Sequence, residues 1–445
     1  LGEHWRADAE LSYLSDRAFL REFYEREFKE GKEQETDLYL RRLEDNESIT
    51  FLLKKQIHRF DTGLETLPQL SYQLISQPLW QDRLNFTSQS ELGYLDFQLD
   101  DELNVRDPAR YTRLQRTTGS SLRMDNNNTL SWPFQFWIWK LKPFVGGRVT
   151  AYSKSLKNHG PNDGPPAGRL ATSLGLDTST NLWRVYGLES KLFRIHRLKH
   201  IITPELRWEA GPIVTENPDD LLQYGPADGL NRYNSFILGI RNRFQTRRGP
   251  ASMQKIVDLF DLDLELHLIP DQNGPEKNVI HTAGNAEGFL IPQKDSFLQP
   301  DFRSQLTDRI ALVSERNEFN LNEFTMDVFN LGVTFQNTPN WSQFLGYRFL
   351  KDISSVVILS TNLLLKEKWG LTFTEVYDFK AEDFTGSTSS KNLSTGIGLS
   401  RRAHDWTGML TLSFDVVNRN TTVRFDILPV GIKRPIGRKY STAPQ

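Results

Sequence analysis

The stretch "LFDLDLELHLIP", from Leu259 to Pro270, alternates between two kinds of side chain without interruption. One parity is leucine throughout, at Leu262, Leu264, Leu266 and Leu268. The other parity is acidic or polar, at Asp261, Asp263, Glu265 and His267. Because successive residues of a β-strand point to opposite faces, this pattern predicts a strand with one apolar face and one acidic face.

The same alternation recurs along the whole chain. Apolar residues occupy every second position in 70–74, 236–240, 329–335, 410–416 and 423–427. We count about twenty to twenty-four such segments, each close to the length of a tilted membrane strand, which is about 9 to 11 residues. The sequence therefore predicts an all-β fold: a large antiparallel transmembrane β-barrel of about 20 to 26 strands.

One segment departs from this alternation. Between Asp16 and Glu35, apolar residues such as Phe19, Phe23 and Phe28 recur at helical spacing among charges, and Asp16 is a suitable N-cap. We expect a short amphipathic helix in an early loop. Other interruptions are rich in Gly, Pro and Asn and are expected to be loops; they lie at 155–168, 211–231, 269–293 and 380–391.

The last third of the chain predicts which connections between strands lie at the same end of the barrel. Connections near residues 337, 366 and 402 alternate with connections near 351, 380 and 418, so the two sets should lie at opposite ends of a meander. Outer-membrane barrels have short periplasmic turns and longer extracellular loops. The only long connection is at 380–391. The first set should therefore be periplasmic, and the final strand should run towards the periplasm.

Bulk composition narrows the possible functions. The net charge of −2 and the lack of a basic patch interleaved with aromatics argue against nucleic acid as a partner. The chain has no cysteine, which excludes disulfides and thiolate metal sites. With a mean hydropathy of −0.51 it has no apolar run near the roughly 20 residues of a spanning helix. Residues 1–16 already alternate and carry no targeting signal, so we expect them to lie inside a domain.

We find no catalytic motif and expect neither enzyme activity nor a cofactor. His196 and His200 have the spacing of a helical zinc pair, but they lie in an apparent strand with no carboxylate or third ligand nearby in the sequence. The sequence therefore predicts no metal site, and these histidines are better explained as a loop or a lumen lining.

A soluble β-sandwich or propeller would also alternate, with its apolar face turned inward. Three features favour the membrane barrel: little helix, no repeat of blade length, and a polar parity that mixes Ser, Thr, Gly and Gln with charges of both signs. Tryptophans near the segment ends suit an interfacial girdle; they are Trp132, Trp137, Trp139, Trp183, Trp208, Trp341, Trp369 and Trp406.

Several motifs, in the same order along the chain, resemble one known family. They are "YLSDRAFLREF" (13–23), "LPQLSY" (67–72), "LKPFVGGRVTAY" (141–152), "HIITPEL" (200–206), "NSFILGIRNRF" (234–244), "IGLSRRAHDWTGMLTLSF" (397–414) and "VRFDILPVG" (423–431). They are similar to the barrel domain of the LPS-assembly outer-membrane family LptD, also called organic solvent tolerance protein. The resemblance covers nearly the whole chain.

The resemblance implies a barrel of about 26 strands in the outer membrane that inserts lipopolysaccharide, or a related glycolipid, into the outer leaflet. It also implies a plug lipoprotein in the lumen and periplasmic bridge proteins that deliver the lipid to a jellyroll domain preceding the barrel. We expect residues 1–432 to form the barrel, without the jellyroll and the first strands, and 433–445 to form a basic tail. The family's cysteines that link barrel and jellyroll are absent here.

In that family the lipid leaves through a lateral gate, the seam between the first and last strands. Here the last alternating run is short and ends at a proline, which offers no amide hydrogen. We therefore predict that this run is the C-terminal side of the gate; its residues are Thr421, Thr422, Val423, Arg424, Phe425, Asp426, Ile427, Leu428 and Pro429.

The acidic parity of the opening stretch is predicted to line the lumen, which is aqueous in barrels of more than about 16 strands. An acidic stripe would repel a phosphate-bearing lipid. We therefore expect Asp261, Asp263, Glu265 and His267 to face basic residues across the lumen or on the plug, or to bind divalent cations. Two other functions remain open, a porin-like or substrate-selective channel and, less favoured, a soluble all-β carbohydrate-binding protein.

Overall fold

The structure is a computed structural model of the chain. It describes residues 4–16, 19, 23, 35–117, 119–157, 164–191, 193–249, 253–270, 295–365, 368–380, 391–415 and 420–429. The 433–445 tail lies outside the described residues.

In the described part of the chain, twenty-three strands form one sheet. The first eleven are β1 (Trp5–Glu10), β2 (Thr36–Glu44), β3 (Glu47–Lys55), β4 (Gly63–Leu79), β5 (Leu84–Gln98), β6 (Ser120–Ser131), β7 (Phe134–Phe136), β8 (Trp139–Tyr152), β9 (Ala167–Ser179), β10 (Leu182–Ser190) and β11 (Ile195–Gly211). The others are β12 (Tyr233–Arg248), β13 (Lys255–Leu268), β14 (Phe297–Thr307), β15 (Ile310–Ser314), β16 (Glu318–Asn320), β17 (Thr325–Thr338), β18 (Trp341–Leu350), β19 (Ser354–Leu365), β20 (Trp369–Asp378), β21 (Lys391–Arg402), β22 (Trp406–Asp415) and β23 (Asn420–Pro429).

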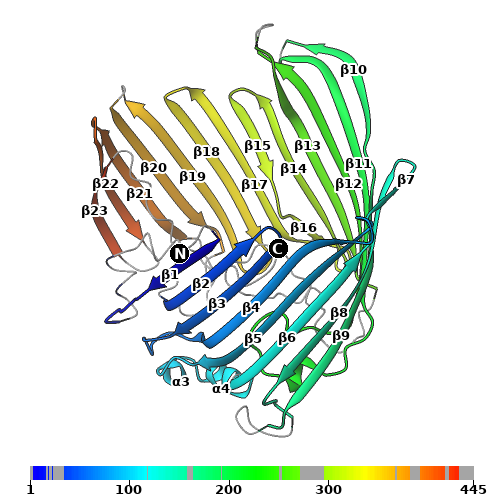
Figure 1. Cartoon of the computed structure of the whole chain (residues 1–445). Coiled ribbons are helices and arrows are strands. Elements are labelled where there is room, and N and C mark those ends of the chain that lie inside the picture. Colours follow the sequence, from blue (N-terminus) through cyan, green and yellow to red (C-terminus); the bar gives the residue numbers. More distant parts are fainter. Residues whose placement is uncertain are drawn as a thin grey trace.

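All of these strands pair in antiparallel fashion, mostly with their neighbours along the chain, and the sheet curves around a hollow (Figure 1). The predicted all-β barrel fold of about 20 to 26 strands is confirmed. The C-terminal strands β18 to β23 have 10 to 12 residues each. At about 3.4 Å per residue and a tilt near 45°, such strands match an apolar band about 25 Å tall.

The two ends of the strands carry different connections. One end has only short connections between successive strands, at 45–46, 80–83, 191–194, 249–254, 308–309, 339–340, 366–368 and 403–405, together with the β7–β8 hairpin. The other end has the long ones, at 11–35, 99–119, 153–166, 212–232, 269–296 and 379–390. The asymmetry expected from the last third of the chain therefore extends over the whole sheet. We call these the short-turn end and the long-loop end.

The wall of the sheet branches near its middle. β9 pairs with β8 along its length and with Glu205–Ala210 of β11, and β10 then continues β9 along Ile195–Ile202 of the same strand. The β7–β8 hairpin points away from β10 (Figure 1). Among the described strands β10 therefore pairs with β11 alone, at the short-turn end.

The helices lie in the long-loop connections. α3 (Leu103–Arg106) and α4 (Pro108–Thr117) join β5 to β6, and a 3₁₀ turn, η1 (Pro218–Asp220), interrupts the β11–β12 connection. Most of the helix expected at 16–35 lies outside the described residues. Of that segment, Phe19 and Phe23 are helical and their rings lie 5.1 Å apart, as expected for neighbours on one helix face.

The apolar parity of the strands is not covered by a second layer. Leu238, Ile240, Leu345, Ile397 and Leu410 are all exposed in the chain. A soluble sandwich would bury these side chains, whereas a membrane barrel turns them to lipid. Buried apolar side chains gather mainly where the β11–β12 connection packs at the long-loop end, and include Leu221 and Leu222.

Candidate functional site

The acidic stripe of β13 lies beside arginines of the neighbouring strand β12. The register sets Asp263 opposite Arg241 and Asp261 opposite Arg243. Arg241 Nη2 lies 2.5 Å from Asp263 Oδ2, and Arg243 Nε lies 3.5 Å from Asp261 Oδ2. Directly opposite charges on one face of an antiparallel pair attract each other, so the register itself neutralises the stripe.

A third arginine reaches the stripe from β11, two strands away. Arg207 Nη2 lies 2.5 Å from Glu265 Oε1, and His267 Nε2 lies 3.2 Å from the other oxygen of that carboxylate. Gly239 of β12 lies between Glu205 of β11 and Glu265 of β13 in the register. Because a glycine has no side chain, the arginine can pass over this position.

The other flank of the stripe, on β14, is also mixed in charge. Asp301 lies opposite Asp263, and its carboxylate accepts hydrogen bonds from Gln299 Nε2, at 3.0 Å, and from Asn317 N, at 3.2 Å. Arg303 lies opposite Asp261 and forms an ion pair with Glu315. Basic partners were expected across the lumen or on a plug. The structure places them on adjacent strands, because neighbours in the sheet are far closer than the opposite wall.

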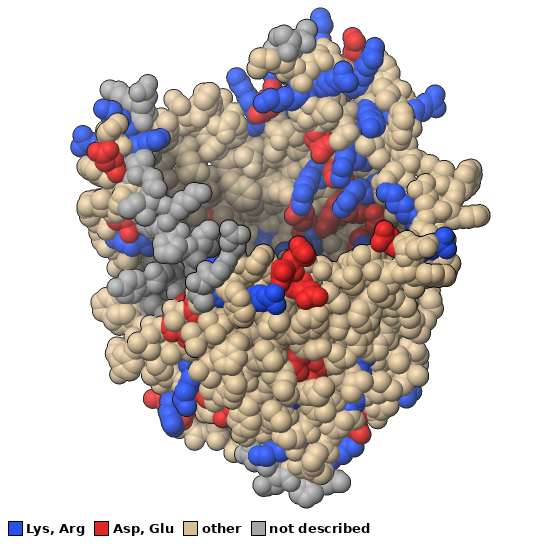
Figure 2. Space-filling model, viewed as in Figure 1, with Lys and Arg blue, Asp and Glu red and all other residues tan. Residues whose placement is uncertain are grey.

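Figure 2 shows acidic and basic side chains gathered in the hollow over β11 to β13, while the neighbouring outer surface is largely uncharged. The polar parity of these strands is the one that carries the ion pairs described above. The opposite parity pairs leucine with leucine or isoleucine, as in Leu238 with Leu266 and Ile240 with Leu264. The wall thus has a charged face and an apolar face, as the alternation predicts.

The predicted gate residues 421–429 form β23, which pairs with β22 alone among the described strands. Val423 and Phe425 are 68% and 65% exposed, against 45% for Leu410 on β22. They are more exposed because no strand covers their second flank. On the other parity Arg424 Nε bonds to Asp426 Oδ2 at 2.7 Å. At the opposite limit of the sheet, β1 pairs with β2 alone, so the sheet ends in a free strand edge on both sides in the described part.

A buried polar cluster fixes the β11–β12 connection against the sheet at the long-loop end. Asp228 of this connection is fully buried, and it accepts a hydrogen bond from Tyr152 Oη. Arg123 Nε lies 2.9 Å from Asp228 Oδ1, and Arg169 Nη1 donates to the backbone oxygen of Asp228 at 2.8 Å. Strands β6, β8 and β9 therefore each contribute one residue to hold the loop.

Two backbone amides of the same loop also donate hydrogen bonds to the carboxylate of Asp228. The backbone amides of Tyr224 and Gly225 donate to Asp228 Oδ2 at 3.0 and 2.8 Å. Burial raises the pKa of Tyr224, so its hydroxyl stays neutral and donates to the oxygen of Gly119 at 3.0 Å. Sequence reasoning missed this cluster. The only signal was the presence of charged residues inside strands, which does not say what they contact.

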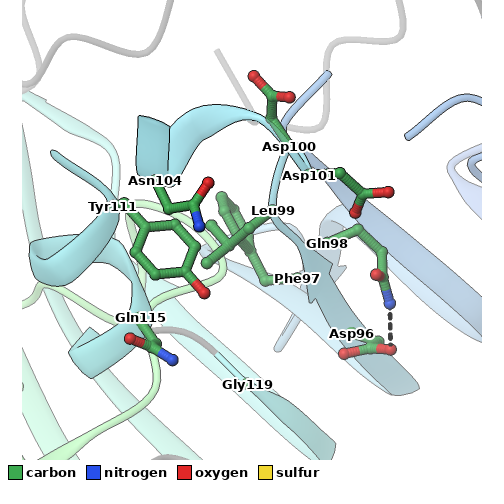
Figure 3. A pocket seen from close by; sticks show the side chains of 10 residues that line it. All are labelled: Asp96, Phe97, Gln98, Leu99, Asp100, Asp101, Asn104, Tyr111, Gln115 and Gly119. Carbon is green, nitrogen blue, oxygen red and sulfur yellow. Dashed lines mark hydrogen bonds between the residues drawn. The ribbon is translucent and has the colours of Figure 1, made fainter. Parts of the chain in front are cut away.

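A cavity of about 370 Å³ lies between the end of β5 and the two helices (Figure 3). Its lining includes Asp96, Asp100, Asp101, Asn104 and Tyr111. Asp96 accepts a hydrogen bond from Gln98 Nε2 at 2.8 Å, and Asp100 accepts one from the amide of Glu102 at 3.0 Å. These two carboxylates thus satisfy local donors and shape the turn into α3.

Tryptophans mark the short-turn end. Of the ten in the chain, eight lie at a strand end or turn there; they are Trp5, Trp80, Trp132, Trp137, Trp139, Trp341, Trp369 and Trp406. Trp183 and Trp208 lie within β10 and β11. Aromatic side chains of this kind concentrate where a barrel crosses the membrane–water interface. The predicted girdle is therefore concentrated at one end.

The described residues hold no group of three or more His, Cys, Asp or Glu side chains placed to bind a metal ion. His200 stacks on Phe244 with ring centroids 4.1 Å apart and bonds to Asn242 at 3.1 Å. In a strand, residues four apart are about 13 Å from each other, so His196 and His200 do not converge on one point. No helix in the described part of the chain is long and apolar enough to cross a membrane.

An antiparallel sheet of this size, with an uncovered apolar face, a charged hollow and turns sorted by length, defines an outer-membrane β-barrel. Residues 1–214 match the sequence model of the family described as "LptD: LPS transport system D". The chain is thus an outer-membrane barrel protein whose residues 1–214 match the LptD family, and over that part of the chain the resemblance found in its motifs is confirmed.

Several solved structures are similar to this chain at low identity and with TM-scores below 0.5. The siderophore receptor PirA from Acinetobacter baumannii is 9% identical with a TM-score of 0.30, covering 85% of this chain and 73% of that one. A mutant of the ferric enterobactin receptor PfeA from Pseudomonas aeruginosa is 11% identical with a TM-score of 0.36, covering 85% and 65%. The FrpB iron transporter from Neisseria meningitidis is 8% identical with a TM-score of 0.26, covering 86% and 63%. No curated protein sequence matches the chain significantly.

Proposed function

We propose that this chain is the barrel of a translocon that inserts lipopolysaccharide, or a related glycolipid, into the outer leaflet of the outer membrane. The family match over residues 1–214 carries the proposal. In this proposal residues 1–432 are the barrel domain, to which a periplasmic bridge delivers the lipid. A plug lipoprotein occupies the hollow.

The charged face, including Asp261, Asp263, Glu265 and His267, is proposed to line the aqueous lumen. The distribution of charges in Figure 2 supports this assignment. A bulky sugar headgroup would travel along this face while its acyl chains pass into the membrane. Because each acid of the stripe has a basic neighbour, the lining would repel phosphates less than an acidic stripe alone.

The lipid is proposed to leave through a lateral gate with β23, residues 421–429, as its C-terminal side. Support comes from the free edges of β1 and β23 in the described sheet, which Figure 1 shows on the same side of the hollow. A seam with few backbone hydrogen bonds opens at lower cost than a continuous ladder, because each broken bond costs about 1 kcal/mol or more.

Disulfide cross-linking tests the gate, and this chain has no cysteine of its own that would compete with the introduced pair. One cysteine replaces Thr422, Arg424 or Asp426, and the second is scanned along β1 and along any strand that precedes it in the full-length protein. Oxidation should stop the appearance of new glycolipid on the cell surface, and reduction should restore it.

The matched control is Ser413→Cys with Thr422→Cys, a pair that faces each other within the existing β22–β23 ladder. That disulfide locks a closed ladder and should leave export unchanged. Export that continues with the seam fully locked would overturn the gate. A steady large conductance of the plug-containing complex in planar bilayers would instead favour the porin-like alternative.

A further inference from the structure

The short-turn ends of β10 to β13 form a basic tip. We define the tip by its exposed basic residues, which are Lys191, Arg194, Arg197, Arg247 and Lys255. Residues 190–199 contain four Lys or Arg and no acid. Figure 2 shows this concentration of Lys and Arg at the top of the molecule. These strands also extend beyond the tops of β14 to β19 in Figure 1.

Among the described residues, four of the five basic residues at the tip differ from the arginines in the hollow because they lack an acidic partner. In the part of the chain that the structure describes, Lys191, Arg197, Arg247 and Lys255 make no ion pair, whereas Arg194 pairs with Asp308. Lower on the same strands, Arg241, Arg243 and Arg207 are all paired with acids of β13 or β11. Unpaired positive charge therefore lies at the tip and compensated charge lies below it.

The tip is also amphiphilic. Met253 and Ile256 are 69% and 68% exposed, and both lie within two residues of Lys255 in the sequence. Ile256 lies opposite Arg247 in the register, so these two side chains share one face of the sheet. A soluble polyanion would need only the basic side chains of the tip for binding. Exposed apolar groups among them suit a ligand that carries both phosphate and hydrocarbon.

We propose that the tip is the receiving surface for the phosphorylated headgroup of the transported glycolipid, an inference that rests on the proposed function. The unpaired side chains of the tip attract the phosphates, and Met253 and Ile256 contact the start of the acyl chains. Arg247, Arg243 and Arg241 share one parity of β12, so guanidinium groups continue from the tip into the hollow. In the hollow, the acidic partners of Arg241 and Arg243 weaken the attraction of these arginines for the phosphates, so the lipid can move on from the tip.

The test measures lipid binding by the purified full-length protein in detergent. The probe is diphosphorylated lipid A; monophosphorylated lipid A and phosphatidylglycerol are the comparison ligands. The tip variant carries Lys191→Gln, Arg197→Gln and Arg247→Gln. Its affinity for diphosphorylated lipid A should fall about a hundredfold at low ionic strength, because each basic side chain near an anionic surface contributes roughly fivefold.

The matched control carries Lys55→Gln, Arg59→Gln and Arg232→Gln, three exposed basic residues at the long-loop end. It changes the net charge equally, and its affinity should stay within about twofold of the unmodified protein because these sites lie beyond a Debye length of about 10 Å from the tip. A second variant, Met253→Ser with Ile256→Ser, should weaken lipid A binding at high salt, where the phosphate contribution is screened.

Three outcomes would overturn the proposal. Equal losses in the tip and control variants would mean a nonspecific charge effect. Phosphatidylglycerol binding as tight as diphosphorylated lipid A would mean a general anionic surface. Unchanged lipid binding in the tip variant would mean that the tip does not bind the lipid. An acidic protein would then be the class of ligand that the positive charge of the tip fits. None of these outcomes bears on the gate, which the cross-linking experiment tests separately.

Discussion

Arg207 on β11 and Glu265 on β13 form an ion pair at 2.5 Å although strand β12 runs between them. Gly239 makes this possible. A Cβ built there would lie 3.4 Å from Glu205 Cβ and 3.9 Å from Glu265 Cγ, so a methyl group fits but a longer side chain would occupy the path of the arginine. The pair joins three strands on the charged face and neutralises one acid of the stripe.

Replacing this glycine with a long side chain should uncouple the pair without unfolding the barrel. We expect Arg207→Gln and Glu265→Gln to show a coupling energy of about 0.5 to 1 kcal/mol in a double-mutant cycle, modest because the arginine is 44% exposed. In a Gly239→Leu background the coupling should vanish, and in a Gly239→Ala background it should persist. Urea unfolding in lipid vesicles measures each step. An equal coupling energy in the Gly239→Leu and Gly239→Ala backgrounds would contradict the conclusion that Arg207 reaches Glu265 over Gly239.

Neutralising the acidic stripe should change ion selectivity and leave the fold intact. Asp261→Asn, Asp263→Asn and Glu265→Gln together remove three negative charges and leave Arg241, Arg243 and Arg207 without their partners on β13. Reversal potentials in planar bilayers, measured on protein without its plug, should shift towards anion selectivity.

Three exposed acids at the short turns serve as the control for this charge change: Asp45→Asn, Asp82→Asn and Asp405→Asn. They lie outside the hollow and should shift the reversal potential far less. If the stripe variant fails to assemble in the membrane, the two faces of β13 have been assigned the wrong way round.

The faces of the strands could be predicted from the sequence because alternation is a local property. Leu264 and Asp263 must point to opposite sides of β13 whatever the rest of the chain does. The helix α4 was missed, although Pro108 at its first position is a typical start signal, because its mostly polar residues show no apolar stripe.

The contacts between strands could not be predicted, because register is set by the whole sheet. A shift of one residue between β12 and β13 would move Arg241 away from Asp263 and turn the leucines to the other side. The buried cluster depends on even longer-range placement, since five further strands, β7 to β11, separate Arg123 from Asp228 in the sequence. No local pattern in the sequence predicts the register between β12 and β13 or the contact between Asp228 and Arg123.

Breaking the buried cluster should loosen the long-loop end. Asp228→Asn keeps the shape of the side chain but removes the charge that faces Arg123, and an uncompensated buried charge costs about 3 to 5 kcal/mol. We expect a lower unfolding midpoint in urea and faster proteolysis within 212–232. Asp219→Asn changes an exposed acid of the same loop and should have little effect. Equal resistance to proteolysis in the Asp228→Asn and Asp219→Asn variants would contradict a structural role for Asp228.

The tryptophan row fixes the depth of the barrel in the membrane. Trp341, Trp369 and Trp406 each begin a strand directly after a short turn, so they should lie at one interface, about 12 Å or more from the bilayer centre. Single-tryptophan variants, with the other tryptophans changed to Phe, report this depth through quenching by lipids brominated at different positions along the acyl chain. All three should be quenched best by bromine closest to the headgroup.

Trp208, near the long-loop end of β11, provides the comparison from the opposite side of the wall. A membrane-impermeant aqueous quencher added outside oriented proteoliposomes should reach either the short-turn tryptophans or Trp208, and never both sets together. Quenching of Trp341 by lipid brominated near the bilayer centre would place the row inside the hydrocarbon. The short-turn end would then not be an interface.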